Sequence, residues 1–214
     1  GIWYQTDESF IESGSNHEIP PSFKLNNLPY MRKQLNTLRS FPEGQRNCYT
    51  LKPKQDNSHQ KQKYLIRASF TYRNYDNKDQ FPRFQLYIGV NYWMTLQLDN
   101  KTYFGYYEII IQGITNGMVQ VCLVDIGEGT PFINTLELRP LSNTLYAAPF
   151  PLSLHLRRDC AKFSGTSHVR YKDDIYDRMW QIYFEDPHCD LIKKGAQEKI
   201  ENSTYELPPE LLLT

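Results

Sequence analysis

The sequence predicts an all-β protein, folded as an antiparallel β-sandwich or jelly roll with a long linker toward the C-terminus. Apolar side chains recur at every second position in several short runs, turn-forming residues separate these runs, and segments with helical periodicity are scarce. Because successive side chains of a strand point to opposite faces, a period of two indicates a strand with one face in a core. We count about six or seven such runs, a number that is typical of a sandwich.

The clearest strand is predicted over Tyr64–Tyr72, where one face is apolar and aromatic and the other is largely polar and charged. A polar loop is predicted over residues 74–79 and ends at Pro82, because Asn, Asp and Pro favour turns. Two more strands follow, predicted over Phe84–Val90 and near Met94–Leu98.

A hairpin is predicted between Tyr106–Gln112 and Met118–Val124. Asn116-Gly117 lies between these two apolar runs. Both residues tolerate the positive φ angles of a tight hairpin turn. The remaining predicted elements are a short helix or turn and two further strands, at Pro29–Leu38, Phe132–Leu138 and Leu152–Leu156.

The composition argues against two classes of function. Lys plus Arg and Asp plus Glu each total 24, so the formal net charge is zero and no basic excess indicates a nucleic-acid partner. No run reaches the roughly 18 apolar residues that span a bilayer, so membrane contact is expected only through segments outside this chain. The 16 Tyr residues are common in β-proteins that recognise sugars or peptides, since a phenol ring combines a flat apolar face with a hydroxyl.

The character of the chain changes after Arg157. Residues 1–157 are predicted to form the sandwich. Residues 158–204 are rich in charged side chains and are predicted to be a linker or long loop. Residues 205–214 contain two Pro residues before an apolar end, and we expect them to begin a second module or to pack back on the core.

The cysteines and two glycosylation motifs give weaker signals. The four cysteines allow three disulfide pairings, and the sequence does not choose among Cys48, Cys122, Cys160 and Cys189. None of them forms a Cys-x-x-Cys motif, so a zinc site is not expected. Asn-x-Thr triplets or their Ser equivalent make two residues candidates for glycosylation, Asn100 and Asn202.

Three segments together resemble the malectin-like domains at the outer end of plant leucine-rich-repeat receptor kinases. They are Leu38–Leu51, Gly129–Leu141 and Tyr171–Trp180. Shorter stretches fit the same family, namely Tyr4–Asp7 with Phe10–Ile11 and Phe84–Asn91 with Trp93. The segments occur in the family's order over almost the whole chain, and this ordered set is specific.

The resemblance implies two tandem malectin-type sandwiches, of which this chain is similar to the N-terminal one. The family has a strand carrying Asp-Cys-Gly before the Tyr4–Asp7 region, and we expect that first strand to be missing here. The resemblance further implies an extracellular or cell-surface module without catalytic activity, whose partner is a peptide ligand, a co-receptor or a cell-wall oligosaccharide. Two alternatives stay open: a lectin-like carbohydrate-binding module acting alone, and a truncated receptor fragment without independent activity.

A ligand site is expected at the loop tips of the sandwich. Animal malectin binds a diglucose unit through loop aromatics and an Asp. By strand position, the aromatic pair falls at Asn74-Tyr75 and the Asp near Gly129-Thr130, where this chain has no carboxylate. The chain therefore departs from the sugar-binding pattern. The candidate ligand-binding residues are Tyr72, Asn74, Tyr75, Asp76 and Tyr106. The competing interpretation places Tyr72 in the core and Tyr75 in local packing.

Charged clusters in the sequence favour structural roles. We expect the polar residues of the first family segment to tie loops together rather than to contact a peptide; they are Arg39, Arg46 and Asn47. A second cluster lacks the Gly and spacing of a calcium loop and predicts an ionic network, formed by Asp173, Asp174, Asp177, Arg170 and Arg178. The five His residues match no metal or hydrolase motif. The sequence therefore predicts a recognition module without cofactor or metal.

Overall fold

The computed structural model describes residues 3–24, 33–53, 62–98, 104–112, 114, 117–147, 151–154, 157–159, 168–182 and 205–208. Regular structure in these residues is almost entirely β, which confirms the predicted class. Its helical parts are short 3-10 segments, namely η1 (Pro21–Phe23), η2 (Lys33–Asn36) and the single described residue Gly117. The short helix or turn predicted over Pro29–Leu38 therefore coincides in part with η2, which leads directly into a strand.

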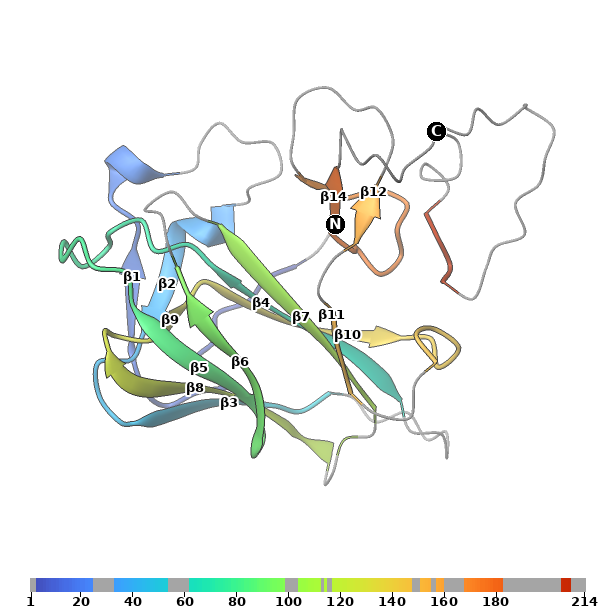
Figure 1. Cartoon of the computed structure of the whole chain (residues 1–214), viewed down its shortest axis with the longest axis horizontal. Helices are drawn as coiled ribbons and strands as arrows, with labels where there is room; N and C mark the ends of the chain where they lie inside the picture. The colour runs from blue at the N-terminus through green and yellow to red at the C-terminus, as the bar shows by residue number, and fades with distance from the viewer. Residues whose placement is uncertain are drawn as a thin grey trace.

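Two four-stranded antiparallel sheets form the sandwich (Figure 1). The first sheet has the order β10 (Thr135–Leu141), β4 (Lys63–Phe70), β7 (Gly105–Gln112), β11 (Leu152–Leu154). The second has the order β3 (Arg46–Leu51), β8 (Val119–Glu128), β5 (Arg83–Ile88), β6 (Asn91–Gln97).

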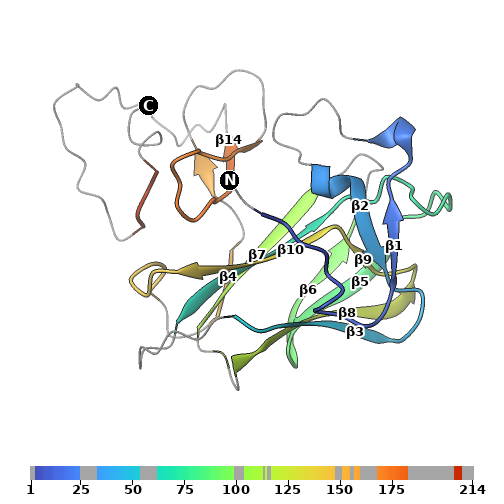
Figure 2. The same cartoon turned by 180° about the vertical axis from the view of Figure 1, so that it is seen from behind.

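Two smaller sheets accompany the sandwich. One has the order β1 (Ser15–Glu18), β2 (Thr37–Ser40), β9 (Phe132–Ile133). The other has the order β12 (Arg158–Asp159), β14 (Trp180–Ile182), β13 (His168–Val169). Figure 2 shows this last sheet, in orange, outside the two large sheets. It lies in the stretch expected to be a linker; the domain boundaries at 157 and 204 stay predictions.

The main core lies between the two large sheets and follows the alternation read from the sequence. In β4, Tyr64, Ile66, Ala68 and Phe70 enter this core, where they meet the apolar faces of β5 and β8. The intervening residues of β4 point away from the core, yet all eight residues of the strand are buried. The outer face of the first sheet is therefore covered as well, and its buried polar groups require partners.

The predicted hairpin across Asn116-Gly117 is wrong. β7 pairs with β4 and β11 in the first sheet, whereas β8 pairs with β3 and β5 in the second. Both strands carry apolar residues that enter the shared core, so the connection crosses from one sheet to the other instead of pairing them. Gly117 does have a positive φ of 69°, but Asn116 lies outside the described residues.

The structure selects one disulfide. Cys48 of β3 bonds to Cys122 of β8, and these two residues are directly opposite in the register of the two strands. The bond closes a sequence separation of 74 residues within the second sheet. The other two cysteines and the two glycosylation candidates lie outside the described residues, namely Cys160, Cys189, Asn100 and Asn202.

Candidate functional site

Four of the five predicted ligand-binding residues lie in the loop that follows β4. The Tyr72 side chain is 1% exposed and belongs to the main core, where its ring packs against Tyr75, Phe81 and Phe132. Its hydroxyl donates to Asp76 Oδ1 at 2.5 Å. The competing core interpretation therefore describes the position of Tyr72, and burial raises its pKa above the ordinary range of a phenol.

The other loop residues shape the loop itself. Asn74 has a positive φ of 50°, and its Oδ1 accepts from the backbone N–H of Asp79 at 2.8 Å. Tyr75 is half-buried and packs against His17 as well as against Tyr72. Burial raises the pKa of Tyr75 to about 12. Asn74 and Asp76 thus direct polar atoms into the loop.

Tyr106 lies on the opposite face of the first sheet from this loop's core contacts. It is opposite Ser69 in the register of β4 and β7, on the face that also carries Arg67 and Glu108. Its ring packs against Phe104 and His168. The structure therefore does not bring Tyr106 together with the other four candidates.

A groove of about 810 Å³ lies between the N-terminal segment and β10. Every residue from Ile133 to Arg139 lines it, so side chains of both strand faces border the groove and the edge of β10 faces it. Within the described strands, β10 pairs only with β4. On the other side lie residues 3–7, including Trp3, whose side chain is 96% exposed.

A bidentate ion pair contributes to the wall of this groove. Arg39 donates from Nε and Nη2 to the two carboxylate oxygens of Asp7, each at 2.7 Å, and from Nη1 to the carbonyls of Ser13 and Gly14. Tyr49 donates to Asp7 at 2.8 Å. Burial acts to raise the pKa of Asp7, but the hydrogen bonds from Arg39 and Tyr49 hold it below the ordinary value. Asp7 therefore stays ionised and fixes the N-terminal segment.

The expectation that the first family segment ties loops together is confirmed. Besides the Asp7–Arg39 pair, Arg46 donates to the Gly89 carbonyl, and Asn47 donates to the carbonyls of Glu43 and Gly44 at 3.1 and 3.0 Å.

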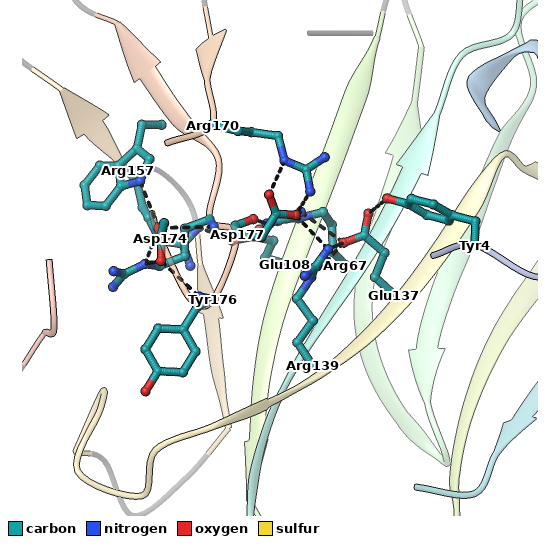
Figure 3. A network of polar contacts seen from close by, with 12 residues as sticks. Tyr4, Arg67, Glu108, Glu137, Arg139, Arg157, Arg170, Asp174, Tyr176 and Asp177 are labelled. Atoms are coloured by element: carbon teal, nitrogen blue, oxygen red, sulfur yellow. Dashed lines mark hydrogen bonds and ion pairs between the residues drawn. The ribbon is translucent and has the colours of Figure 1, made fainter. Parts of the chain in front are cut away.

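A buried ionic network covers the outer face of the first sheet (Figure 3). Arg67 of β4 is 0% exposed and donates to Glu108 of β7 at 2.6 Å and to Glu137 of β10 at 3.0 Å. The remaining guanidinium nitrogen of Arg67, Nη2, donates to the Asp177 backbone carbonyl at 2.9 Å. Burial acts to raise the pKa of Glu137, but the nearby guanidinium groups lower it to about 2.

The network connects the sheet to residues 168–182. Asp177 accepts from Arg139 at 2.8 Å and from Arg170, while Asp174 accepts from Arg178 at 2.9 Å. Arg178 in turn donates to the carbonyls of Tyr205 and Glu206. The predicted ionic network is confirmed for Asp174, Asp177, Arg170 and Arg178, whereas Asp173 is exposed and lies outside the network. These contacts join the segment after the sandwich to the outer sheet face.

Sequence reasoning missed the sheet-face partners of this network and a second cavity beside it. This cavity, of about 480 Å³, is lined by Tyr106 and by residues not selected from the sequence, among them Trp93, Arg157 and His168. The alternation in the sequence already places Arg67 and Glu108 on the polar faces of their strands. That the two residues are partners follows only from the strand register. The described residues hold no group of three potential metal-ligating side chains, and none of their helices is long and apolar enough to cross a membrane.

Comparison with known proteins assigns the chain to a family. The family model for the Malectin-like domain matches residues 1–214. A putative leucine-rich repeat receptor-like serine/threonine-protein kinase of Arabidopsis thaliana (At2g19230) is 46% identical over 215 residues, covering 100% of this chain and 23% of the relative. A second Arabidopsis receptor-like kinase (At2g19210) is 44% identical over 179 residues, covering 84% and 20%. The chain thus spans about a fifth of the length of these relatives.

Solved structures agree on the fold. The ectodomain of ANX1 from Arabidopsis thaliana superposes with a TM-score of 0.59 at 12% identity, covering 82% of this chain and 49% of that one. The plant receptor-like kinase FER gives a TM-score of 0.55 at 14% identity, with coverage of 81% and 46%.

Proposed function

Because this chain belongs to the malectin-like domain family, we propose that it is the extracellular ligand-recognition module of a receptor-like kinase. Its task is recognition without catalysis, and the kinase activity belongs to a separate part of the receptor. The single observation that carries a specific ligand class is the groove beside β10. It favours a peptide or a peptide segment of a protein partner, such as a co-receptor.

The groove suits an extended peptide for two reasons. A volume of about 810 Å³ lies within the range of roughly 300–1,000 Å³ that is usual for ligand sites. The edge of β10 borders it, and a strand edge offers main-chain donors and acceptors to an added strand. Main-chain hydrogen bonds of this kind provide affinity, while the side chains that line the groove provide sequence specificity.

Trp3 is the expected anchor for the peptide. Its side chain lines the groove and is almost fully exposed, whereas large aromatic side chains are usually buried unless they meet a partner. Aromatic residues of this kind dominate the binding free energy of many interfaces. The peptide is therefore placed between Trp3 and β10.

Carbohydrate binding by the Tyr72–Asp76 loop is the second ligand class, and the geometry supports it less. Sugar recognition needs polar atoms that face the ligand as well as a flat ring. Tyr72 is buried in the core, and Asn74 and Asp76 already hold hydrogen bonds inside the loop. Tyr75 is the remaining aromatic side chain with partial exposure.

Selection of a phage-displayed random peptide library against the 214-residue chain tests the peptide proposal. We expect enriched peptides to lose affinity by roughly tenfold or more for Trp3→Ala, which removes the anchor, and for Thr6→Trp, which fills the groove. Matched control variants carry the same changes in type at exposed positions outside the groove, Val90→Ala and Ser9→Trp, and should bind as the wild type does.

The proposal is contradicted if the enriched peptides bind all four variants equally. Binding to cell-wall oligosaccharides on a glycan array, with loss of that binding in Tyr75→Ala, would favour the carbohydrate class instead. Melting temperatures of the variants show whether a loss of binding reflects a loss of fold.

A further inference from the structure

The cavity of about 480 Å³ beside Tyr106 lies away from the β10 groove, on the far side of the first sheet. It is bordered by β6, β7, β11 and the small sheet of β13 and β14. From the first sheet, residues 105–108 of β7 and residues 153–154 of β11 line it.

Two buried donors at this cavity have no acceptor. Within the described part of the chain, Trp93 Nε1 and Arg157 Nη2 are shielded from solvent and make no hydrogen bond. Each of these residues is 7% exposed, and both line the cavity. A buried donor without a partner costs about 1–3 kcal/mol, so such groups in native proteins call for an explanation.

The charges around the cavity favour a negative acceptor. Glu108 is the carboxylate that lines it, and its two oxygens already accept from Arg67 and from Arg157 Nη1. Arg67 pairs with Glu137 as well as with Glu108, whereas Arg157 has Glu108 as its carboxylate partner and its Nη2 makes no hydrogen bond. A planar guanidinium fork is suited to bind a carboxylate.

Aromatic side chains form much of the remaining wall, beside Met94, Leu154 and the polar Ser153 and Gln181. Phe104, Tyr106, Tyr107 and His168 line the cavity together with Trp93. Tyr106 and His168 pack edge to face, with ring centroids 5.6 Å apart. Burial lowers the pKa of His168, so its ring is uncharged near neutral pH and acts as a further aromatic wall. Such walls bind the flat face of a sugar or aromatic ring.

We propose that this cavity is a binding site for a carboxylate carried on a ring, held by Arg157 and Trp93 and stacked against Tyr106. A hexuronate and an aromatic acid share this chemistry. The site is separate from the β10 groove, so it goes beyond the peptide-recognition proposal and does not depend on it.

Nuclear magnetic resonance of the indole N–H groups tests this site directly. The chain has three Trp residues and therefore three indole resonances, of which one is absent in Trp93→Phe. Titration with glucuronate or benzoate at constant ionic strength should move that resonance, with a Kd on the order of 1 mM for ligands of this size. Glucose, which lacks the carboxylate, and acetate, which lacks the ring, should bind at least roughly tenfold more weakly.

Two conservative variants isolate the donors. Trp93→Phe keeps a ring and removes Nε1–H, and Arg157→Lys keeps the charge beside Glu108 and removes the guanidinium fork. Each should weaken glucuronate or benzoate binding by roughly tenfold. Because Trp93→Phe lacks the Trp93 resonance, the Kd values of the wild type and of both variants are compared from the resonances of the ligand. The matched controls are Tyr92→Phe, in the exposed position next to Trp93, and Arg83→Lys, in the surface pair with Glu128. Both should bind as the wild type does.

The outcomes separate the sources of the carboxylate. Binding of glucuronate alone assigns a sugar acid, and binding of benzoate alone assigns an aromatic acid; either supports the proposal. The proposal is overturned if neither acid moves the Trp93 resonance, if glucose binds as tightly as glucuronate, or if both variants leave the Kd unchanged.

Discussion

Arg67 and its carboxylate partners show how a single strand position organises the outer sheet face. Arg67 lies in the middle of β4, and its guanidinium group joins β7, β10 and the Asp177 turn. Full burial of a charge is costly unless every donor finds an acceptor. Here the neighbouring strands provide Glu108 and Glu137 at the matching register positions.

Glu137 leads to a prediction for pH dependence. Its pKa in the folded protein is about 2, below the ordinary value of 4.5, so the folded state favours the ionised form. The stability it contributes is complete above the ordinary pKa and is lost as the pH falls toward 2; the total is roughly 3 kcal/mol. Denaturant unfolding at a series of pH values should show this loss.

The variant Glu137→Gln should be less stable at neutral pH and should lose less stability between pH 5 and pH 2, because it removes this titration. Glu128→Gln, in an exposed pair with Arg83, should keep the wild-type pH profile. An unchanged profile in Glu137→Gln would assign the acid sensitivity to other groups.

At the scale of elements, the two large sheets are held in different ways. β4 and β7 pair over eight consecutive positions, whereas β3 and β8 also share the Cys48–Cys122 disulfide. A disulfide that closes a long loop stabilises mainly by restricting the unfolded chain. The second sheet therefore gains stability that the apolar core does not supply.

Replacing both cysteines with Ala should lower the free energy of unfolding by about 2–5 kcal/mol. The folded-state spectrum should be retained, because β3 and β8 still pair over six positions. Denaturant titration of the double variant measures the loss. A change below roughly 0.5 kcal/mol would mean that the unfolded chain is already compact near these strands.

At the scale of the whole molecule, the segment after the sandwich is docked by charge. The Asp177 carboxylate accepts hydrogen bonds from Arg139 of β10 and from Arg170 of its own segment. The Asp177 backbone carbonyl accepts a hydrogen bond from Arg67. Tyr176 of the same segment also packs in an apolar cluster with Leu65 and Ile110. A buried network that loses one member becomes costly, because the charges left behind are unpaired.

Asp177→Ala should therefore release residues 168–182 while the sandwich stays folded. Hydrogen–deuterium exchange should become faster in β13 and β14 and remain slow in β4 and β8. Asp173→Ala is the matched control, because Asp173 lies four residues earlier and is exposed. Equal exchange in the two variants would show that apolar packing holds the segment instead.

Local patterns predicted the strands with an apolar face well. The observed bounds of β4, β5, β6 and β7 agree with the predicted runs to within about three residues, because alternation is a local property of the chain. The short strands β1, β2, β12, β13 and β14 were not predicted, since two to four residues carry too little periodicity. The six-residue strand β3 was also not predicted.

The sequence could not predict where a side chain lies relative to other strands. Tyr72 and Tyr106 both appeared as surface aromatics, yet one enters the core and the other lies across the sheet in a cavity with Trp93 and Arg157. The orphaned donors of that cavity are visible only when β6, β7 and the docked segment meet.

The sequence by itself determined the all-β class, the family and the charged composition of the segment after Arg157. Only the tertiary structure decided which strands share a sheet, which cysteines pair, and what covers the polar face of β4. The physical reason is that alternation is fixed by the geometry of neighbouring residues, whereas strand pairing and charge burial depend on contacts between residues far apart in the chain.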